Sequence, residues 1–159
     1  MPLLLAGLGA FSVLVFTLSH FVPLYLRSAK TSEPRNELGL IGKLALEAYE
    51  RDGHLCASAS APVPRSLVAV RARNYQSPAA EWSVDAPANA GFACLGFEMP
   101  GPQYYQYDYR VGADGKTFTA TARGDLDGDG RPSIFRLEGK IVVGKLEIDP
   151  VIDETAPEE

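Results

Sequence analysis

Hydrophobic and polar positions divide residues 1–52 into two halves of one helical pattern. Residues 2–26 are apolar and contain no Lys, Arg, Asp or Glu. At about 1.5 Å of rise per residue, such a stretch is long enough to cross a bilayer core of roughly 30 Å. Beyond Arg27 the periodicity becomes amphipathic, because apolar residues recur three and four positions apart at Leu38, Ile41, Leu44, Ala45, Ala48 and Tyr49. The pattern predicts a long N-terminal helix that ends near Gly53 and has a membrane-spanning first half.

The apolar half is better explained as a retained anchor than as a cleaved signal peptide. No basic residue precedes it, it is longer than a signal-peptide core, and no small-x-small site closes it. We expect residues 1–29 to form a transmembrane or filament-core helix, residues 30–148 a globular head, and residues 149–159 an acidic flexible tail. The expected helix-packing and membrane residues are Leu3, Leu4, Leu5, Phe11, Val13, Leu14, Val15, Phe16, Leu18, Phe21 and Pro23.

Short apolar runs between turn residues predict a β-rich second half. The expected strands cover residues 92–99, 103–111, 116–123, 132–138 and 141–148, with a turn at Gly139-Lys140. Their hairpin-length connections favour an antiparallel sheet of four to five strands, whose apolar face the helix covers. The fold class predicted is therefore α+β.

The segment between the helix and the sheet, residues 54–91, has no periodicity. A short strand or turn is expected around Leu67–Val70, and the only Trp, Trp82, is expected to plug the core. In the run QYYQYDYRV, Tyr105, Tyr107 and Tyr109 share one strand face, so core packing is favoured over a ligand platform.

Charge and cysteine count narrow the class of protein. A net charge of −5 and a pI near 5.1 argue against a nucleic-acid partner. Cys56 and Cys94 are the only cysteines, and beside an export-type segment they favour a disulfide in an oxidising compartment. The alternative is two buried, reduced thiols.

The direction of the chain across a membrane is ambiguous from charge alone. Arg27, Lys30 and Arg35 follow the apolar stretch, and by the positive-inside rule they favour a cytoplasmic head. The cysteine pair favours a head outside the cytoplasm.

The run GDLDGDGR contains a D-x-D-x-D-G pattern that suits Ca²⁺. Alternate carboxylates converge on one ion, the Gly permits a sharp turn, and later residues add oxygens. The candidate ligands are Asp125, Asp127, Asp129, the Arg131 carbonyl and Ser133. A bidentate Glu is missing, because the twelfth position is Arg136. The alternative is a hairpin turn stabilised by Asx hydrogen bonds.

Several stretches resemble type IV pilins and pseudopilins, in particular pilin-like proteins of gliding bacteria and their relatives. Residues 21–28 (FVPLYLRS) resemble the pilin segment at the membrane edge, and residues 46–53 (LEAYERDG) resemble the exit of the pilin helix. Residues 95–97, 104–107 and 118–130 resemble the sheet and the acidic hairpin. The family's basic leader would have to lie upstream of Met1, and its glutamate near the mature N-terminus would fall near Ala6.

This resemblance implies a non-enzymatic structural subunit of a type IV pilus or pseudopilus-like filament. The partners implied are the inner membrane and other pilin-like subunits, with a single-pass position in the cytoplasmic membrane, a head outside the cytoplasm, and an extracellular location once assembled. The alternative is a membrane-anchored, non-polymerising module that binds Ca²⁺, a ligand or a partner. No catalytic constellation is recognisable in the sequence, so an enzyme is not expected.

Overall fold

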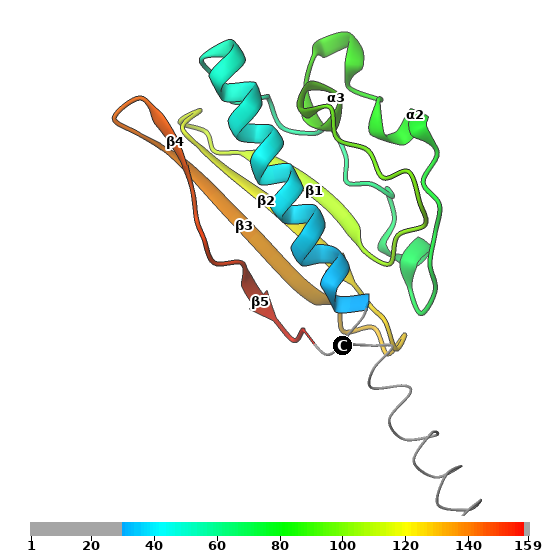
Figure 1. Ribbon diagram of the computed structural model, residues 1–159. Coiled ribbons are helices and arrows are strands. Elements are labelled where there is room, and N and C mark those ends of the chain that lie inside the picture. The colour runs from blue at the N-terminus through cyan, green and yellow to red at the C-terminus, as the bar shows by residue number, and fades with distance from the viewer. Residues whose placement is uncertain (1–29, 158–159) are drawn as a thin grey trace, which may run out of the picture.

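The computed structural model describes residues 30–157 and has two main layers. One layer is a helix, and the other is the antiparallel sheet across which the helix lies (Figure 1). Residues 30–52 are helical. The sheet contains β1 (Gln106–Val111), β2 (Thr117–Gly124), β3 (Ser133–Val142), β4 (Lys145–Ile148) and β5 (Asp153–Thr155). The strand order is β1-β2-β3-β4, β5 pairs with β3, and every pairing is antiparallel.

The helix packs on the sheet through one stripe of its surface. The buried positions recur three and four residues apart, as an amphipathic helix requires: Thr31, Pro34, Leu38, Ile41, Ala45 and Ala48. Gly42 lies on this stripe, and a Cβ added there would lie 2.7 Å from Leu137 Cδ2. The missing side chain lets the helix backbone approach β3 closely.

Alternating side chains of the strands fill the face that the helix covers. The buried set contains Tyr105, Tyr107, Tyr109, Phe118, Ala120, Ala122, Phe135 and Leu137. Gly139 is the register partner of Phe118, and a Cβ at Gly139 would collide with the Phe118 ring. The Phe118 ring therefore occupies the space that a side chain at position 139 would need.

The connection between helix and sheet forms a small layer of short helices beside the main one. It contains η1 (Leu67–Val70), α2 (Ala79–Trp82), η2 (Ala86–Ala88) and α3 (Gly91–Leu95). Trp82 is buried, with ring centroids 5.1 Å from Phe92 and 5.3 Å from Phe97. The predicted role of Trp82 as a core plug is confirmed.

Two sequence predictions of strands are wrong in detail. Residues 91–95 form α3 where a strand was expected, because a short continuous apolar run has no periodicity that separates helix from strand. Gly96, at φ +70°, ends that helix. The turn expected at Gly139-Lys140 lies instead at Val143-Gly144, since Gly139 is required opposite Phe118 inside β3.

The C-terminal residues contribute a strand that the acidic sequence did not indicate. Asp153–Thr155 forms β5, in register with Ile134–Arg136 of β3. Arg35 of the helix donates to both carboxylate oxygens of Glu154, at 2.6 and 2.8 Å. This charge-assisted pair fastens the tail to the helix.

The predicted pilin-like fold class and membrane location need correction. Among residues 30–157, no helix is long and apolar enough to cross a membrane. Residues 30–157 therefore do not support the predicted long helix with a membrane-spanning half or the single-pass anchor, because the helix described there covers residues 30–52 alone. The packing residues predicted between Leu3 and Pro23 lie outside the described residues.

Candidate functional site

The loop between β2 and β3 brings three carboxylates together. Side-chain oxygens of Asp125, Asp127 and Asp129 all lie within 4.8 Å of one another. Asp125 is buried, whereas Asp127 and Asp129 are exposed. Gly128 (φ +83°) and Gly130 (φ +93°) adopt the left-handed backbone that this tight loop needs. The D-x-D-x-D-G pattern thus folds into one acidic cluster.

Asp125 is already engaged by cationic and backbone donors. Its Oδ2 accepts hydrogen bonds from Arg71 Nε at 2.8 Å and from the Gly130 N–H at 3.1 Å, and its Oδ1 accepts one from the Gly128 N–H at 2.8 Å. Burial alone raises the pKa of Asp125, but Arg71 and these N–H groups outweigh it and lower the pKa. Arg71 therefore supplies the positive charge beside the one buried carboxylate of the cluster.

The other predicted ligands are placed differently. The Asp127 carboxylate accepts a hydrogen bond from the Asp129 N–H at 3.1 Å, and the Asp129 carboxylate accepts one from the Arg131 N–H at 2.7 Å. Both are the hydrogen bonds of Asx turns. The Arg131 guanidinium lies 3.9 Å from Asp129 and is largely exposed. Ser133 is fully buried in β3 and donates its hydroxyl to the Gly124 carbonyl at 3.2 Å. The structure therefore groups the three Asp side chains and gives the Ser133 hydroxyl another partner.

Chemically, the cluster has the donor set of a weak site for a hard divalent cation. Three carboxylates supply oxygens of the kind that Ca²⁺ prefers. A cation sharing Asp125 would compete with the Arg71 guanidinium, which already bonds the same oxygen as Gly130. The loop is held by its own hydrogen bonds in either case.

A half-buried glutamate that the sequence analysis did not single out lies near the start of the described helix. Glu33 accepts hydrogen bonds from the Tyr104 N–H (3.0 Å), the Tyr105 N–H (3.2 Å) and the Tyr107 hydroxyl (2.9 Å). Burial raises the pKa of Glu33, and the neighbouring carboxylate of Glu37 adds to this, against the lowering effect of the three donors. Two features of the sequence could have pointed to Glu33. It stands beside Pro34 at the margin of the apolar stripe of the helix, and the chain contains a Tyr-rich strand that can supply hydrogen-bond donors.

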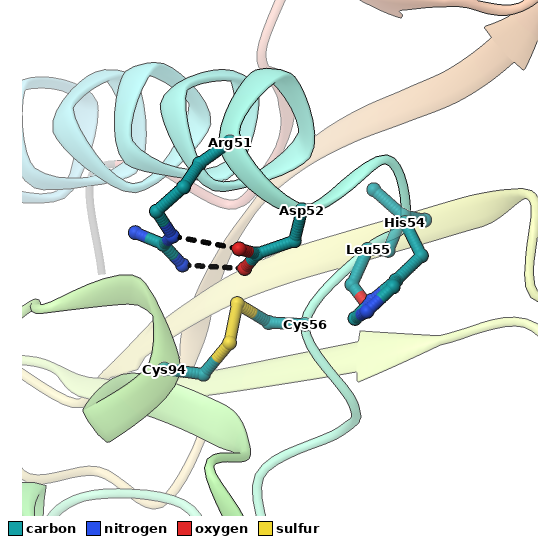
Figure 2. Close-up of a disulfide and its surroundings, with 6 residues drawn as sticks. All are labelled: Arg51, Asp52, His54, Leu55, Cys56 and Cys94. Carbon is teal, nitrogen blue, oxygen red and sulfur yellow. Dashed lines mark hydrogen bonds and ion pairs between the residues drawn. A yellow bond between two sulfur atoms is a disulfide. The ribbon is translucent and has the colours of Figure 1, made fainter.

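The predicted disulfide is confirmed. Cys56 and Cys94 are bonded across 38 positions of sequence, and no free cysteine is found among the described residues. Figure 2 shows the bond joining the segment after the helix to α3, beneath the Arg51–Asp52 ion pair at the helix end. The disulfide therefore fixes α3 close to the point where the helix leaves the sheet.

Tyr107 and Tyr109 of β1, together with Tyr105 just before the strand, form part of the core. Tyr105, Tyr107 and Tyr109 are fully buried, and their rings contact Phe135, Phe97 and Phe118. Burial raises the pKa of Tyr105 to about 12. A flat ligand has no access to these ring faces, which agrees with the predicted packing role.

Comparison of the chain with protein-family models, with curated proteins and with solved structures found no match.

Proposed function

We propose that this protein is a non-enzymatic structural subunit of a type IV pilus or pseudopilus-like filament. The observation that carries the proposal is that the helix of residues 30–52 is fixed to the sheet near both of its described ends. A subunit under mechanical load needs such a connection between its helix and its head.

Near the start of the described helix, the connection is electrostatic and partly buried. Glu33 accepts bonds from the segment that leads into β1, and Arg35 pairs with Glu154 of β5. These two residues reach elements on different sides of the sheet, because β1 lies at one edge and β5 pairs with β3. Rotation of the helix on the sheet would break one set of bonds or the other.

Near its C-terminal end, the helix is held by a hydrogen bond and a covalent bond. The Tyr49 hydroxyl donates to the Gly144 carbonyl in the β3–β4 turn at 3.1 Å. Just beyond the helix, Cys56 is bonded to Cys94 of α3. The C-terminal end of the helix is thus attached to the head at two places, the β3–β4 turn and α3.

The apolar sequence that precedes the described residues supplies the partner surface in this proposal. Residues 2–26 contain no Lys, Arg, Asp or Glu, and burial of such a segment between copies is favourable by roughly 25 cal/mol per Å² of apolar surface. Other pilin-like subunits are the partners expected. No nucleic-acid partner is proposed, since the net charge is −5.

The test is mechanical shearing of cells that produce the full chain, followed by immunoblotting of the sheared and cell-bound fractions. We expect the chain in the sheared, sedimentable fraction. Its confinement to the cell-bound fraction, with an intact and correctly folded head, would refute the proposal. Cys56→Ala/Cys94→Ala serves as the folding control, because it weakens the head without touching residues 2–26.

A second candidate is a non-polymerising module that binds Ca²⁺. It is favoured by one observation, the convergence of Asp125, Asp127 and Asp129 within 4.8 Å. In this proposal the ion is structural and of weak affinity, and it stiffens the β2–β3 loop. Retention in the cell-bound fraction together with a Ca²⁺-dependent melting temperature would favour this candidate over the filament subunit.

A further inference from the structure

The two edges of the sheet are finished differently. At the β1 edge, the Val63 N–H donates to the Tyr107 carbonyl and the Tyr107 N–H donates to the Val63 carbonyl, both at 2.8 Å. The Ala59 N–H adds a hydrogen bond of 2.9 Å to the Tyr109 carbonyl. At the opposite edge, β4 pairs with β3 alone among residues 30–157 (Figure 1). The sheet therefore has one covered edge and, at β4, one free edge.

The main-chain groups of Leu146 and Ile148 point away from β3. Hydrogen-bonded and non-hydrogen-bonded pairs alternate along an antiparallel ladder. The Asp149 N–H donates to the Glu138 carbonyl at 2.8 Å, so by this alternation Leu146 and Ile148 are the residues of β4 that are not bonded to β3. No hydrogen bond from another part of residues 30–157 reaches their main chain. A row of such N–H and C=O groups can pair with a further strand.

The side chains of β4 are divided between the two faces of the sheet. Leu146 is buried on the helix side, so it presents only main chain to the free edge. Lys145 and Glu147 are exposed, and because successive side chains of a strand alternate, they lie together on the face away from the helix. Neither belongs to an ion pair among the described residues. The free edge thus carries one unpaired charge of each sign.

This order of charges makes β4 complementary to itself in one register. In a symmetric antiparallel pair, the two-fold axis passes at one residue of each copy. With the axis at Leu146, Lys145 of each copy lies opposite Glu147 of the other, and opposite charges across strands are stabilising. An axis at Lys145 or Glu147 places that residue opposite itself, and an axis at Ile148 places Glu147 opposite Asp149. Each of these other registers opposes like charges, which is destabilising.

We propose that β4 pairs with β4 of a second copy, antiparallel and centred on Leu146, so that the two sheets join into one. The Leu146 N–H of each copy donates to the Leu146 carbonyl of the other, and two Lys145–Glu147 pairs form on the open face. The β3–β4 turn of each copy then lies beside residues 149–151 of the other. Val143 and Val151, which are 97% and 70% exposed in the single chain, are thereby brought to the same ends of the contact.

This contact goes beyond the proposed function and does not rest on it. Both copies use the same surface, so the contact is isologous and closes after two chains. It therefore joins heads in pairs and does not itself extend a filament. It is also separate from the packing of residues 2–26 between subunits.

Disulfide trapping between two full-length chains tests the pairing. One chain carries Lys145→Cys and a second, differently tagged chain carries Glu147→Cys; both are produced in the same cells, treated with a mild oxidant and separated by non-reducing electrophoresis. The two native cysteines are bonded to each other, so the introduced thiol is the reactive one. We expect a mixed dimer that carries both tags, because directly opposite residues have Cβ atoms about 4.5–5.5 Å apart.

Lys140→Cys replaces Lys145→Cys in the matched control. Lys140 is exposed on the same sheet face and lies opposite Glu147 of its own chain, on β3, one strand in from the edge. Chains with Lys140→Cys are expected to form no mixed dimer with Glu147→Cys chains. Absence of the mixed dimer from the test pair, or a larger amount of Glu147→Cys dimer, would overturn the proposed pairing.

A charge reversal at the second ion pair tests the register. In the trapped dimer, Glu147 of the first chain still lies opposite Lys145 of the second. Glu147→Lys in the first chain, or Lys145→Glu in the second, opposes like charges and is expected to lower the yield of mixed dimer by roughly two- to tenfold. Both changes together are expected to restore the yield, which a folding defect in either chain would not allow. A combined variant that stays as low as the single changes would overturn the pairing.

The pairing and the filament subunit fail in different ways. A mixed dimer in cells that yield no sheared filaments would refute the filament subunit and leave the pairing standing. Sheared filaments that contain the chain, without the mixed dimer, would overturn the pairing and leave the filament subunit standing.

Discussion

The carboxylate of Glu33 accepts a hydrogen bond of 2.9 Å from the hydroxyl of Tyr107, 74 positions away in the chain. The same carboxylate accepts the N–H groups of Tyr104 and Tyr105, so one side chain joins the helix to the entry of the sheet. Tyr107 is itself fully buried. The pair therefore joins a half-buried carboxylate of the helix to a buried tyrosine of the sheet.

Glu33 predicts a specific pH dependence of stability. Burial raises its pKa above the usual 4.5, so the folded state favours the neutral acid. Its stabilising contribution is therefore full below about pH 4.5 and is lost as the pH rises through the folded-state pKa. Glu33→Gln keeps an acceptor oxygen and removes the titration. The melting temperatures of the wild type and of Glu33→Gln are expected to coincide at about pH 4. Towards about pH 8, the melting temperature of the wild type is expected to fall below that of the variant.

The control for this experiment is Glu50→Gln, an exposed position near the other end of the same helix, which is expected to keep the wild-type pH profile. A wild type that is more stable than Glu33→Gln at about pH 8 would contradict the assigned pKa direction. It would mean that the ionised carboxylate is the form the fold prefers.

The close approach of helix and sheet predicts opposite effects at two glycines. Gly39 has no atom within 4 Å of a built Cβ, so Gly39→Ala is expected to stabilise by about 0.5–1 kcal/mol through helix propensity. At Gly42 the added Cβ lies 2.7 Å from Leu137 Cδ2 in the packed core. Gly42→Ala is expected to be less stable than Gly39→Ala by about 1–3 kcal/mol, measured by denaturant unfolding. Equal gains at both positions would mean that the helix lies further from β3.

The disulfide is expected to contribute a large share of the stability of the head. Closing a loop of 38 positions corresponds to about 3–4 kcal/mol of unfolding free energy in the chain-entropy account. Cys56→Ala/Cys94→Ala should lower the unfolding free energy by that amount, and reductant should then have no further effect. Alkylation of the denatured, unreduced wild type should label neither cysteine. Labelling of both cysteines would show that the disulfide is absent.

The acidic loop predicts a calcium effect of limited size. If Ca²⁺ binds, a chelator should lower the melting temperature of the full chain, and Asp127→Ala should abolish the difference. Asp114→Ala, in the exposed β1–β2 turn, is the control and should retain it. Identical melting temperatures with and without chelator would contradict Ca²⁺ binding by the loop. The Arg71 guanidinium would then be the cation that pairs with Asp125.

Local patterns were sufficient to predict much of the sheet and of the helix face. Strands β1 and β2 match the alternation around Tyr107 and Phe118, and the buried helical stripe follows the three-and-four spacing through Leu38 and Ala48. Both are periodic signals carried by neighbouring residues, which sequence reasoning detects well.

The features missed depend on contacts between distant residues. Gly139 was interpreted as a turn because only the fold shows the Phe118 ring over it. β5 has no apolar pattern, and it is held by pairing with β3 and by the Arg35–Glu154 ion pair, both of which join residues far apart in the sequence. Likewise, the sequence brings the three Asp residues together but does not reveal that Arg71, 54 positions away, bonds Asp125.

The most direct test of the proposed filament subunit is immunogold labelling of sheared, negatively stained filaments with an antibody raised against residues 30–157. The account predicts gold particles at regular intervals along the filament length, and their loss in cells that lack the gene. Filaments that carry no label, while the same antibody detects the folded protein in the cell-bound fraction, would contradict it.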